Sequence, residues 1–449
     1  MSNLPINEIN GWKILGPGGG GCVHCLTINP LRPETMLVSC DMTNGFITHD
    51  GGQSWREFNL KSRFYSFAFD QHNADVIYAG SSGLFRSGDN GQTWQLLFPD
   101  PDAVTGEKRL GDEGNHFYTS SDNWPGGPIT AIKPHPLHKD TIFICIKKSG
   151  LRFLGGDIKA EEEAAAQAGT WLYASGNNGK SWEQVASIEG VEIFFMYVDF
   201  DAPGFLYVFT EQGFFRIDLN SKLIASIGLP DAIIRIRFAS HGVNPETGKT
   251  IFYLSAVSDR SRVWTSDDFG STWSQDVTGL TVTEDSRGRL SSIRPSFSHV
   301  SACANDARTA YLIAEQYPAP DGTVQHGILK TVDQGRTWHW VVNMSDTRDP
   351  DNREIGWPER DYGAPWDDIV LEGHSQITPK GLFAWDVLTS PVDPNVCLTA
   401  DYSTVFRTDD GGASWKQLVS HLHDDGSVSS RGLDLLTAYS LFFDPFDDD

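Results

Sequence analysis

Long apolar runs are absent from this chain of 449 residues. No stretch of 18 apolar residues is available to cross a bilayer as a helix, so we expect no membrane span. The segment Met1 to Trp12 has neither the basic region nor the apolar region of a signal peptide. The sequence taken by itself therefore predicts a cytoplasmic protein, or a secreted one if a leader precedes Met1.

Basic residues are scarce relative to acidic ones. The chain has 35 Lys and Arg residues against 59 Asp and Glu residues, which gives a formal net charge of −24. Such a surface repels both a phosphate backbone and an anionic lipid headgroup. We therefore expect no nucleic acid and no membrane as partners. An anionic sugar is still compatible with this net charge as a partner, because a local cluster of Arg and His can lie within an acidic surface.

Cysteine is also scarce, with six residues. Cys22 and Cys25 fall in one predicted strand, where alternation places them on opposite faces, so we expect packed thiols rather than a disulfide or a zinc site. The glycine run that ends at Gly21 is followed by neither Lys-Ser/Thr nor a helix, which argues against a phosphate-binding loop. We expect no metal and no cofactor.

What the chain does have is a phrase repeated six times, Ser/Thr-x-Asp-x-Gly-x-Ser/Thr-Trp, with Asn in place of Asp once. The acidic and hydroxyl side chains suit hydrogen bonds to the backbone of a tight turn, and glycine allows the backbone conformation. The tryptophan then begins a strand with a large apolar face. We interpret the phrase as a structural turn without catalytic chemistry. Its acid or amide positions are Asp50, Asp89, Asn177, Asp268, Asp333 and Asp410.

These turns resemble Asp boxes, the BNR repeats of sialidases, sortilin-type receptors and xyloglucan-active glycosidases. The resemblance implies a β-propeller, in which stacked units bury one another's apolar faces. Strand-like runs between the turns give seven blades of four antiparallel strands, with each repeated turn between the third and fourth strands. The fourth blade carries Leu219 to Lys222 instead. We predict an all-β, seven-bladed propeller over residues 1–421, and a ring-closing segment or the first strand of a second propeller over residues 422–449.

Helical sequence is almost absent, with residues 159–168 as the one candidate. Four junctions between blades are long: 99–128, 280–295, 345–382 and 421–437. Long loops on a rigid scaffold commonly carry binding sites, and loop aromatics suit stacking on sugar rings. The candidate substrate-binding residues are Arg63, His116, Tyr118, Trp124, Trp357, Trp366 and His374.

The segment Ser39 to Phe46 resembles the opening of the two-propeller glycosidases that cut xyloglucan. In that family, the Asp of a Thr-Asp-x-Gly-Gly phrase is one of two catalytic carboxylates, and Asp41 is the matching position, with Cys40 in place of Thr. Comparable strand ends hold Glu211, Glu315 and Asp401. Glycoside hydrolysis needs two carboxyl groups. We therefore expect a glycoside hydrolase acting on a plant-type or β-glucan-like poly- or oligosaccharide. Its candidate catalytic residues are Asp41, Glu315 and Asp401.

Other functions stay open. A polysaccharide lyase acting on uronates needs a base, an acid and a group that neutralises the carboxylate, roles that His116, Tyr118 and Arg63 suit. His24 and Tyr65 also map to the axis. A sialidase is less favoured, because its Arg-Ile-Pro phrase is missing and the nearest string begins at Arg235. A non-catalytic propeller that binds a glycan or a protein is the third alternative.

Overall fold

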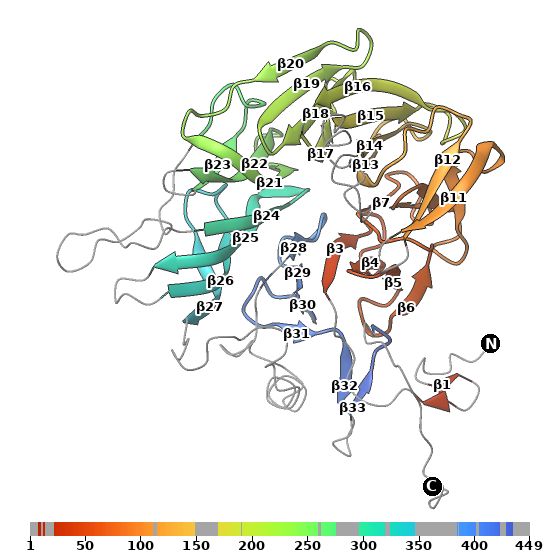
Figure 1. Ribbon diagram of the computed structural model, residues 1–449. Coiled ribbons are helices and arrows are strands. Elements are labelled where there is room, and N and C mark those ends of the chain that lie inside the picture. Colours follow the sequence, from red (N-terminus) through yellow and green to blue (C-terminus); the bar gives the residue numbers. More distant parts are fainter. Residues whose placement is uncertain are drawn as a thin grey trace, which may run out of the picture.

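The computed structural model describes residues 8–9, 12–13, 22–110, 115–148, 169–189, 191–258, 262–274, 296–318, 324–345, 384, 386–400, 404–422 and 428–433. They form a seven-bladed, all-β propeller with antiparallel blades, as predicted (Figure 1). Six blades have four strands. In the fifth, three strands are followed by a single bridge between Thr265 and Ser274 within the described part of the chain.

The strands of each blade follow one another in chain order from the axis outwards. The innermost strands of blades one to seven are β3 (Val23–Ile28), β7 (Ser66–Phe69), β13 (Ile129–Pro134), β17 (Ile193–Val198), β21 (Ile233–Val243), β24 (Ser296–Cys303) and β28 (Asp386–Thr389). The second strands are β4 (Met36–Cys40), β8 (Ile77–Gly80), β14 (Ile142–Lys148), β18 (Phe205–Thr210), β22 (Thr250–Ser258), β25 (Asp306–Pro318) and β29 (Cys397–Ala400).

The outer half of each blade is arranged in the same way. The third strands are β5 (Asn44–Thr48), β9 (Leu84–Ser87), β15 (Gly169–Ser175), β19 (Gly213–Asp218), β23 (Arg262–Ser266), β26 (Val324–Thr331) and β30 (Val405–Thr408). The fourth strands are β6 (Arg56–Asn59), β10 (Gln95–Phe98), β16 (Glu183–Glu189), β20 (Ile224–Ile227), β27 (His339–Ser345) and β31 (Lys416–Gln417).

Burial explains why the second strands contain almost only apolar and small residues. β4, β8 and β29 are buried at every position, because each lies inside its blade with a neighbouring blade on either face. A strand covered on both faces reads as a continuous apolar run rather than as an alternating one. The buried clusters accordingly join residues of adjacent blades, such as Phe58 of blade one with Phe85 of blade two.

The repeated turn follows the third strand of its blade in all six copies. In the copy after β9, Ser87 Oγ accepts a hydrogen bond from Gly91 N (2.8 Å), and the Asp89 carboxylate accepts from Thr93 N (2.9 Å) and Thr93 Oγ1 (2.6 Å). Hydrogen bonds from Thr93 and Ser87 lower the pKa of Asp89 to about 2. The Asp89 oxygens are thus committed to the turn itself.

The tryptophan of each repeated turn contacts the preceding blade. Trp94 stacks on Phe58 of blade one, with ring centroids 4.9 Å apart, and Trp182 stacks on Phe98 of blade two at 5.2 Å. Gly179, at φ +82°, lies so close to blade two that a Cβ atom there would stand 2.3 Å from Leu97 Cδ2. The repeated turn therefore joins neighbouring blades as well as two strands of one blade.

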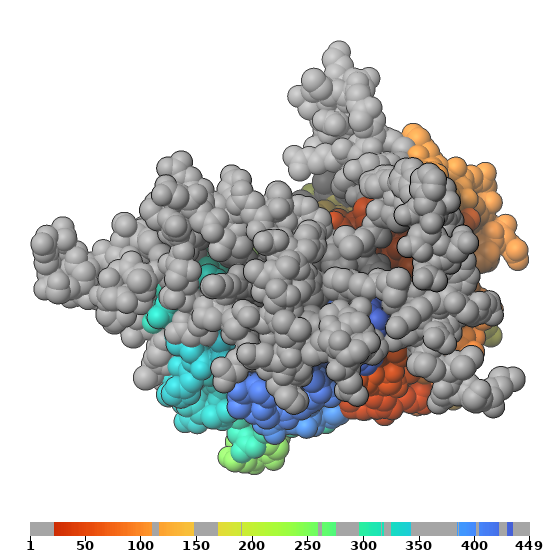
Figure 2. All heavy atoms as spheres, turned by 90° about the horizontal axis from the view of Figure 1, so that it is seen from below, coloured from red at the N-terminus to blue at the C-terminus, as the bar shows by residue number. Residues whose placement is uncertain are grey.

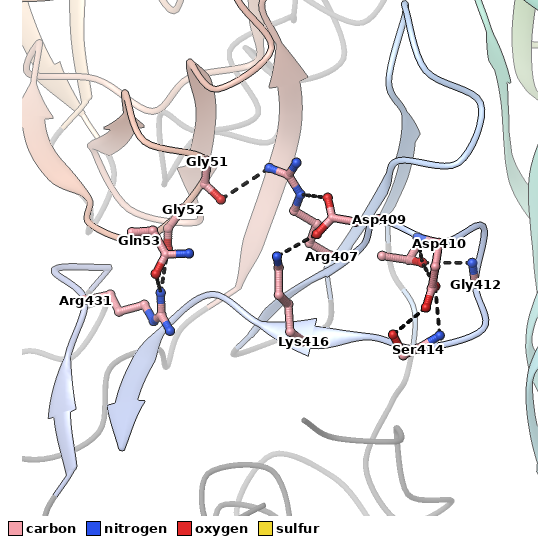
Figure 3. A network of polar contacts seen from close by, with 11 residues as sticks. Gly51, Gly52, Gln53, Arg407, Asp409, Asp410, Gly412, Ser414, Lys416 and Arg431 are labelled. Atoms are coloured by element: carbon pink, nitrogen blue, oxygen red, sulfur yellow. Dashed lines mark hydrogen bonds and ion pairs between the residues drawn. The ribbon is translucent and has the colours of Figure 1, made fainter. Parts of the chain in front are cut away.

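Blades seven and one meet through the same kind of contact. Trp55 Nε1 donates to Leu418 O (3.0 Å), and Arg407 Nη1 donates to Gly51 O (3.3 Å). Arg431, beyond blade seven, donates from Nη1 to Gln53 Oε1 (2.7 Å), as Figure 3 shows. In the space-filling view, blade seven (blue) lies beside blade one (red) (Figure 2).

Within the described part of the chain, three hairpins lie outside the blades. They are β1 (Glu8–Ile9) with β2 (Trp12–Lys13), β11 (Val104–Leu110) with β12 (Asn115–Ser120), and β32 (Ser420–Leu422) with β33 (Val428–Ser430). The predicted loop 99–128 thus contains a hairpin and a 3-10 turn, η1 (Pro101–Ala103). The predicted helix at 159–168 and the predicted loop 280–295 lie outside the described residues, as do residues 346–382 of the third loop.

All six cysteines are free thiols. The register of β3 shifts between His24 and Thr27, where Cys25 takes φ +56°, so the strand bulges there instead of alternating regularly. Among the described residues, no helix is long and apolar enough to cross a membrane.

Candidate functional site

The inner strands of all seven blades surround a cavity of about 630 Å³ on the propeller axis. Its wall is mainly apolar and contains a small set of ionisable side chains. These are His24, Cys25, Tyr65, Lys133, Glu192, His241, His299 and Asp386. A largely apolar cavity with a few polar groups is the usual form of a ligand site, and its size falls within the range of about 300–1,000 Å³ seen for such sites.

Asp41 is fixed beside one mouth of this cavity. It follows the last residue of β4, in the loop that leads to β5. Its backbone N–H donates to Cys22 O (3.0 Å), and its carboxylate Oδ1 accepts from Cys22 N (3.3 Å). This pair of contacts ties the loop to the start of β3, so the half-buried carboxylate is held in place by backbone groups.

His24 and Arg63 lie together next to Asp41. Arg63 donates from Nε to His24 Nε2 (3.4 Å), and its guanidinium lies 5.9 Å from the centre of the Tyr65 ring. Burial and the charge of Arg63 lower the pKa of His24 to about 4, although Asp41 acts in the opposite direction. His24 is therefore neutral near pH 7, with Nε2 accepting. Its Nδ1 is buried without a hydrogen-bond partner in the described structure.

Glu315 is a tightly paired carboxylate. Arg237 binds it in bidentate fashion, from Nη1 to Oε2 (2.6 Å) and from Nη2 to Oε1 (2.9 Å), and Ser296 Oγ donates to Oε2 (2.7 Å). Burial alone would raise the pKa of Glu315, but the hydrogen bonds from Arg237 and Ser296 outweigh it and lower the pKa. An ionised carboxylate with both oxygens occupied is poorly suited to donate a proton.

Two further ion pairs join neighbouring blades, one between blades three and four and one between blades four and five. Lys147 Nζ lies 2.5 Å from Glu192 Oε2, and Arg235 Nη1 lies 3.7 Å from Glu211 Oε1. Arg235 and Arg237 belong to the string nearest to the Arg-Ile-Pro phrase of sialidases. Each of these two arginines faces a glutamate of the protein itself, Glu211 and Glu315 respectively.

Asp386 is a carboxyl group in the cavity wall that no sequence motif marks. It begins β28, and its Oδ2 accepts from Leu26 N (3.3 Å). Burial raises the pKa of Asp386, while the neighbouring His299 and the N–H groups of Leu26 and Val387 oppose the rise. The only signal in the sequence is its position at the start of an inner strand, which is also the signal that pointed to His24.

The predicted residues of the first long loop lie elsewhere. His116, on β12, pairs through Nδ1 with Glu107 Oε1 (2.5 Å), and its backbone N–H donates to Lys61 O (3.1 Å). The hairpin is thus attached next to Arg63. Tyr118 is half-buried among the apolar residues of blades two and three. Trp124 is 8% exposed and meets Phe98 edge-on, with centroids 4.8 Å apart. This conformation leaves Trp124 no free face for a sugar ring.

The structure thus brings Asp41 and Arg63 together with His24 and Tyr65, and attaches the hairpin of His116 next to Arg63. Four predicted residues lie outside the described part of the chain, namely Trp357, Trp366, His374 and Asp401.

This arrangement defines a seven-bladed propeller with a charged site at one mouth of its axial cavity. No protein-family model matches the sequence, and no curated protein matches it. Among solved structures, the chain resembles an ancestral GH74 enzyme, with 17% identity and a TM-score of 0.55 over 91% of this chain and 48% of that one.

Two further solved structures resemble it in the same way. The GH74 xyloglucanase from Xanthomonas campestris has 12% identity and a TM-score of 0.54 over 90% of this chain and 55% of its own. The GH74 enzyme from Niastella koreensis has 14% identity and a TM-score of 0.55 over 90% and 55%. The chain therefore spans about half the length of these proteins. At such identities the likeness concerns the fold alone.

Proposed function

We propose that this chain is a carbohydrate-active propeller, and specifically a glycoside hydrolase that cuts a β-glucan-like polysaccharide of the xyloglucan type. The observation that carries the proposal is the carboxylate of Asp41, held by Cys22 N–H beside the mouth of the axial cavity. Its sequence context resembles the catalytic carboxylate of two-propeller xyloglucan glycosidases. The shared fold with GH74 enzymes supports the same choice.

The second carboxyl group is best assigned to Asp401. Asp386 bonds to Leu26 N and Asp41 to Cys22 N on the same segment. The contact of Asp386 lies four residues further along this segment, away from the end of β3 next to Asp41, and glycosidases place their two carboxyls about 5–9.5 Å apart. Glu315 is bound to Arg237. Asp401 follows the last residue of β29 just as Asp41 follows that of β4, in the adjoining blade.

In this proposal, the remaining predicted residues shape the substrate cleft. Trp357 and Trp366 would stack on sugar rings, and His374 would bind hydroxyl groups. A second propeller, as predicted for a longer chain, would form the opposite wall of the cleft. Arg63 and Tyr65 would contact the polysaccharide at the mouth of the cavity.

Release of reducing sugar from xyloglucan and from other β-glucans tests the proposal. We expect Asp41→Asn and Asp401→Asn each to lower kcat by at least about 100-fold, because each removes a carboxyl group that acts in the transition state. Asp201→Asn is the matched control, since Asp201 is exposed in the turn after β17. Full activity in Asp41→Asn would refute the assignment. Glycan binding without turnover would indicate a recognition propeller instead.

A lyase that acts on uronates is the second candidate, and the contact between Arg63 and His24 favours it. A guanidinium can neutralise a uronate carboxylate, and Tyr65 beside it can move a proton. The lowered pKa of His24, about 4, makes this imidazole a weak base, which places the lyase second. Ultraviolet absorbance of an unsaturated product from uronate polymers, abolished in Arg63→Met, would favour it over the hydrolase.

A further inference from the structure

A second cavity, of about 480 Å³, opens at the other end of the axis. Asp41 contacts Cys22, next to the start of β3, whereas this cavity is lined by Thr27 and Ile28 at its end. The turns that join inner strands to second strands form its mouth, and Pro30, Phe200 and Val392 are among the residues there. It adjoins the larger cavity, with which it shares Lys133 and His241, and it lies at the opposite end of β3 from Asp41.

The rim of this second cavity exposes large apolar side chains. Leu31 is 50% exposed, Phe200 49% and Val392 40%, and each belongs to the turn after the inner strand of its blade. The turn of Leu31 is held by Asn29, whose Oδ1 accepts from Leu31 N (2.9 Å). Scattered exposed apolar residues need no explanation, but several around one cavity mouth indicate an apolar ligand.

Lys133 is the one charged side chain among the described residues that line this cavity. It lies on the inner strand β13 and also lines the larger cavity, so it stands where the two adjoin. Its ammonium forms no hydrogen bond and no ion pair with any described residue. Burial lowers the pKa of Lys133 to about 8, so the amine is still mostly protonated near pH 7. The Lys133 side chain is partly buried in the axial channel, where an ammonium without a counter-ion is unfavourable and an anion beside it would offset that penalty.

His241 lies beside Lys133 but carries no charge that would attract an anion. Its ring packs edge-on against Tyr197, with centroids 4.7 Å apart, and against Phe195 at 5.4 Å. Burial and the charge of Lys133 keep the pKa of His241 well below its ordinary value, so the imidazole is neutral. The inner end of the cavity therefore presents a single positive charge within apolar walls.

We propose that this cavity binds an amphiphilic monocarboxylate, with its carboxylate on Lys133 and its apolar body against Leu31, Phe200 and Val392. The charge of the ligand follows from the single unpaired ammonium, and its apolar body follows from the rim. The volume accommodates a medium-chain or aromatic acid. This inference does not depend on the glycoside hydrolase proposal, because it concerns the other end of the axis.

Isothermal titration calorimetry with octanoate, octanol and acetate tests the proposal. We expect octanoate to bind with 1:1 stoichiometry and at least about tenfold more tightly than octanol, which lacks the charge, or acetate, which lacks the chain. Lys133→Met, which keeps the length of the side chain, should bring octanoate down to the affinity of octanol. Lys139→Met is the matched control, because Lys139 is exposed in the turn after the same strand.

Each outcome of these titrations either supports or overturns the binding of a carboxylate at Lys133. Octanoate that fails to saturate, or that keeps its preference over octanol in Lys133→Met, would overturn the proposal. An equal loss in Lys139→Met would show surface binding only. Phe200→Asp tests the rim at an exposed position that does not endanger folding, and it should weaken octanoate binding at least about tenfold by charge repulsion. Asp41→Asn should leave octanoate binding unchanged, whatever its effect on glycans.

Discussion

At the scale of single residues, the same side-chain type acquires different properties from its surroundings. Asp41, Glu315 and Asp386 are all carboxyl groups near one end of the axis. Arg237 holds Glu315 ionised, burial favours the neutral form of Asp386, and Asp41 is held by a backbone N–H. Because the neighbours of Glu315 and Asp386 come from adjoining blades, 78 and 360 positions away in the chain, sequence position alone could not rank the three acids.

His24 gives a prediction at this scale. Its pKa is lowered from 6.5 to about 4, so below pH 6.5 the unfolded chain binds a proton that the folded protein rejects. Stability must then fall as pH drops through this window. Between about pH 7.5 and about pH 5 we expect His24 to account for a loss on the order of 2 kcal/mol.

Urea unfolding of the wild type and of His24→Asn at both pH values measures this loss, which the variant should lack. Burial also lowers the pKa of His299 and His241, so the variant should keep part of the pH dependence. His339→Asn, at an exposed position on β27, should behave as the wild type. Identical pH slopes for the wild type and His24→Asn would contradict the linkage.

At the scale of elements, the repeated turn combines local and long-range roles. Its hydroxyl and carboxylate hydrogen bonds are local, as in Ser87 and Asp89, and follow directly from the repeated phrase. Its glycine also faces the preceding blade, which the phrase alone does not reveal. A side chain at Gly179 would meet Leu97 and would strain a backbone at φ +82°.

Gly179→Ala should therefore destabilise the protein by about 2 kcal/mol, from the positive φ and the clash with Leu97 together. Gly176→Ala is the matched control three residues earlier, because a Cβ atom there would meet nothing within 4 Å. Its effect should stay within about 0.5 kcal/mol. Thermal and urea unfolding midpoints provide the measurement, and equal midpoints for the two variants would argue against contact between blades through this turn.

At the scale of the whole molecule, closure of the ring depends on contacts between residues far apart in sequence. Trp55 and Leu418 are separated by 363 positions and are joined by a hydrogen bond inside one buried cluster. Leu433 belongs to the same cluster, and Arg431 bonds to Gln53. We propose on this basis that residues after 421 include a ring-closing segment.

Trp55→Ala should be among the most destabilising single changes. Trp55 is 2% exposed, and removing a buried indole costs about 3–5 kcal/mol. Trp273→Ala is the comparison, since Trp273 is partly exposed between blades four and five, and it should cost roughly half as much. We expect the urea midpoint to show this order, and the reverse order would contradict a special role for the junction between blades seven and one.

The architecture could be predicted from the sequence alone, because the strand periodicity recurs in every blade and the repeated turn in six of the seven. It located Asp41 and Arg63 near the axis for the same reason. Which groups meet there follows from the fold and not from local patterns. The pairs of Arg237 with Glu315, Asp386 with Leu26, and Trp124 with Phe98 form where separate strands or blades converge. The unpaired charge of Lys133 belongs to this second kind, since burial is a property of the closed ring.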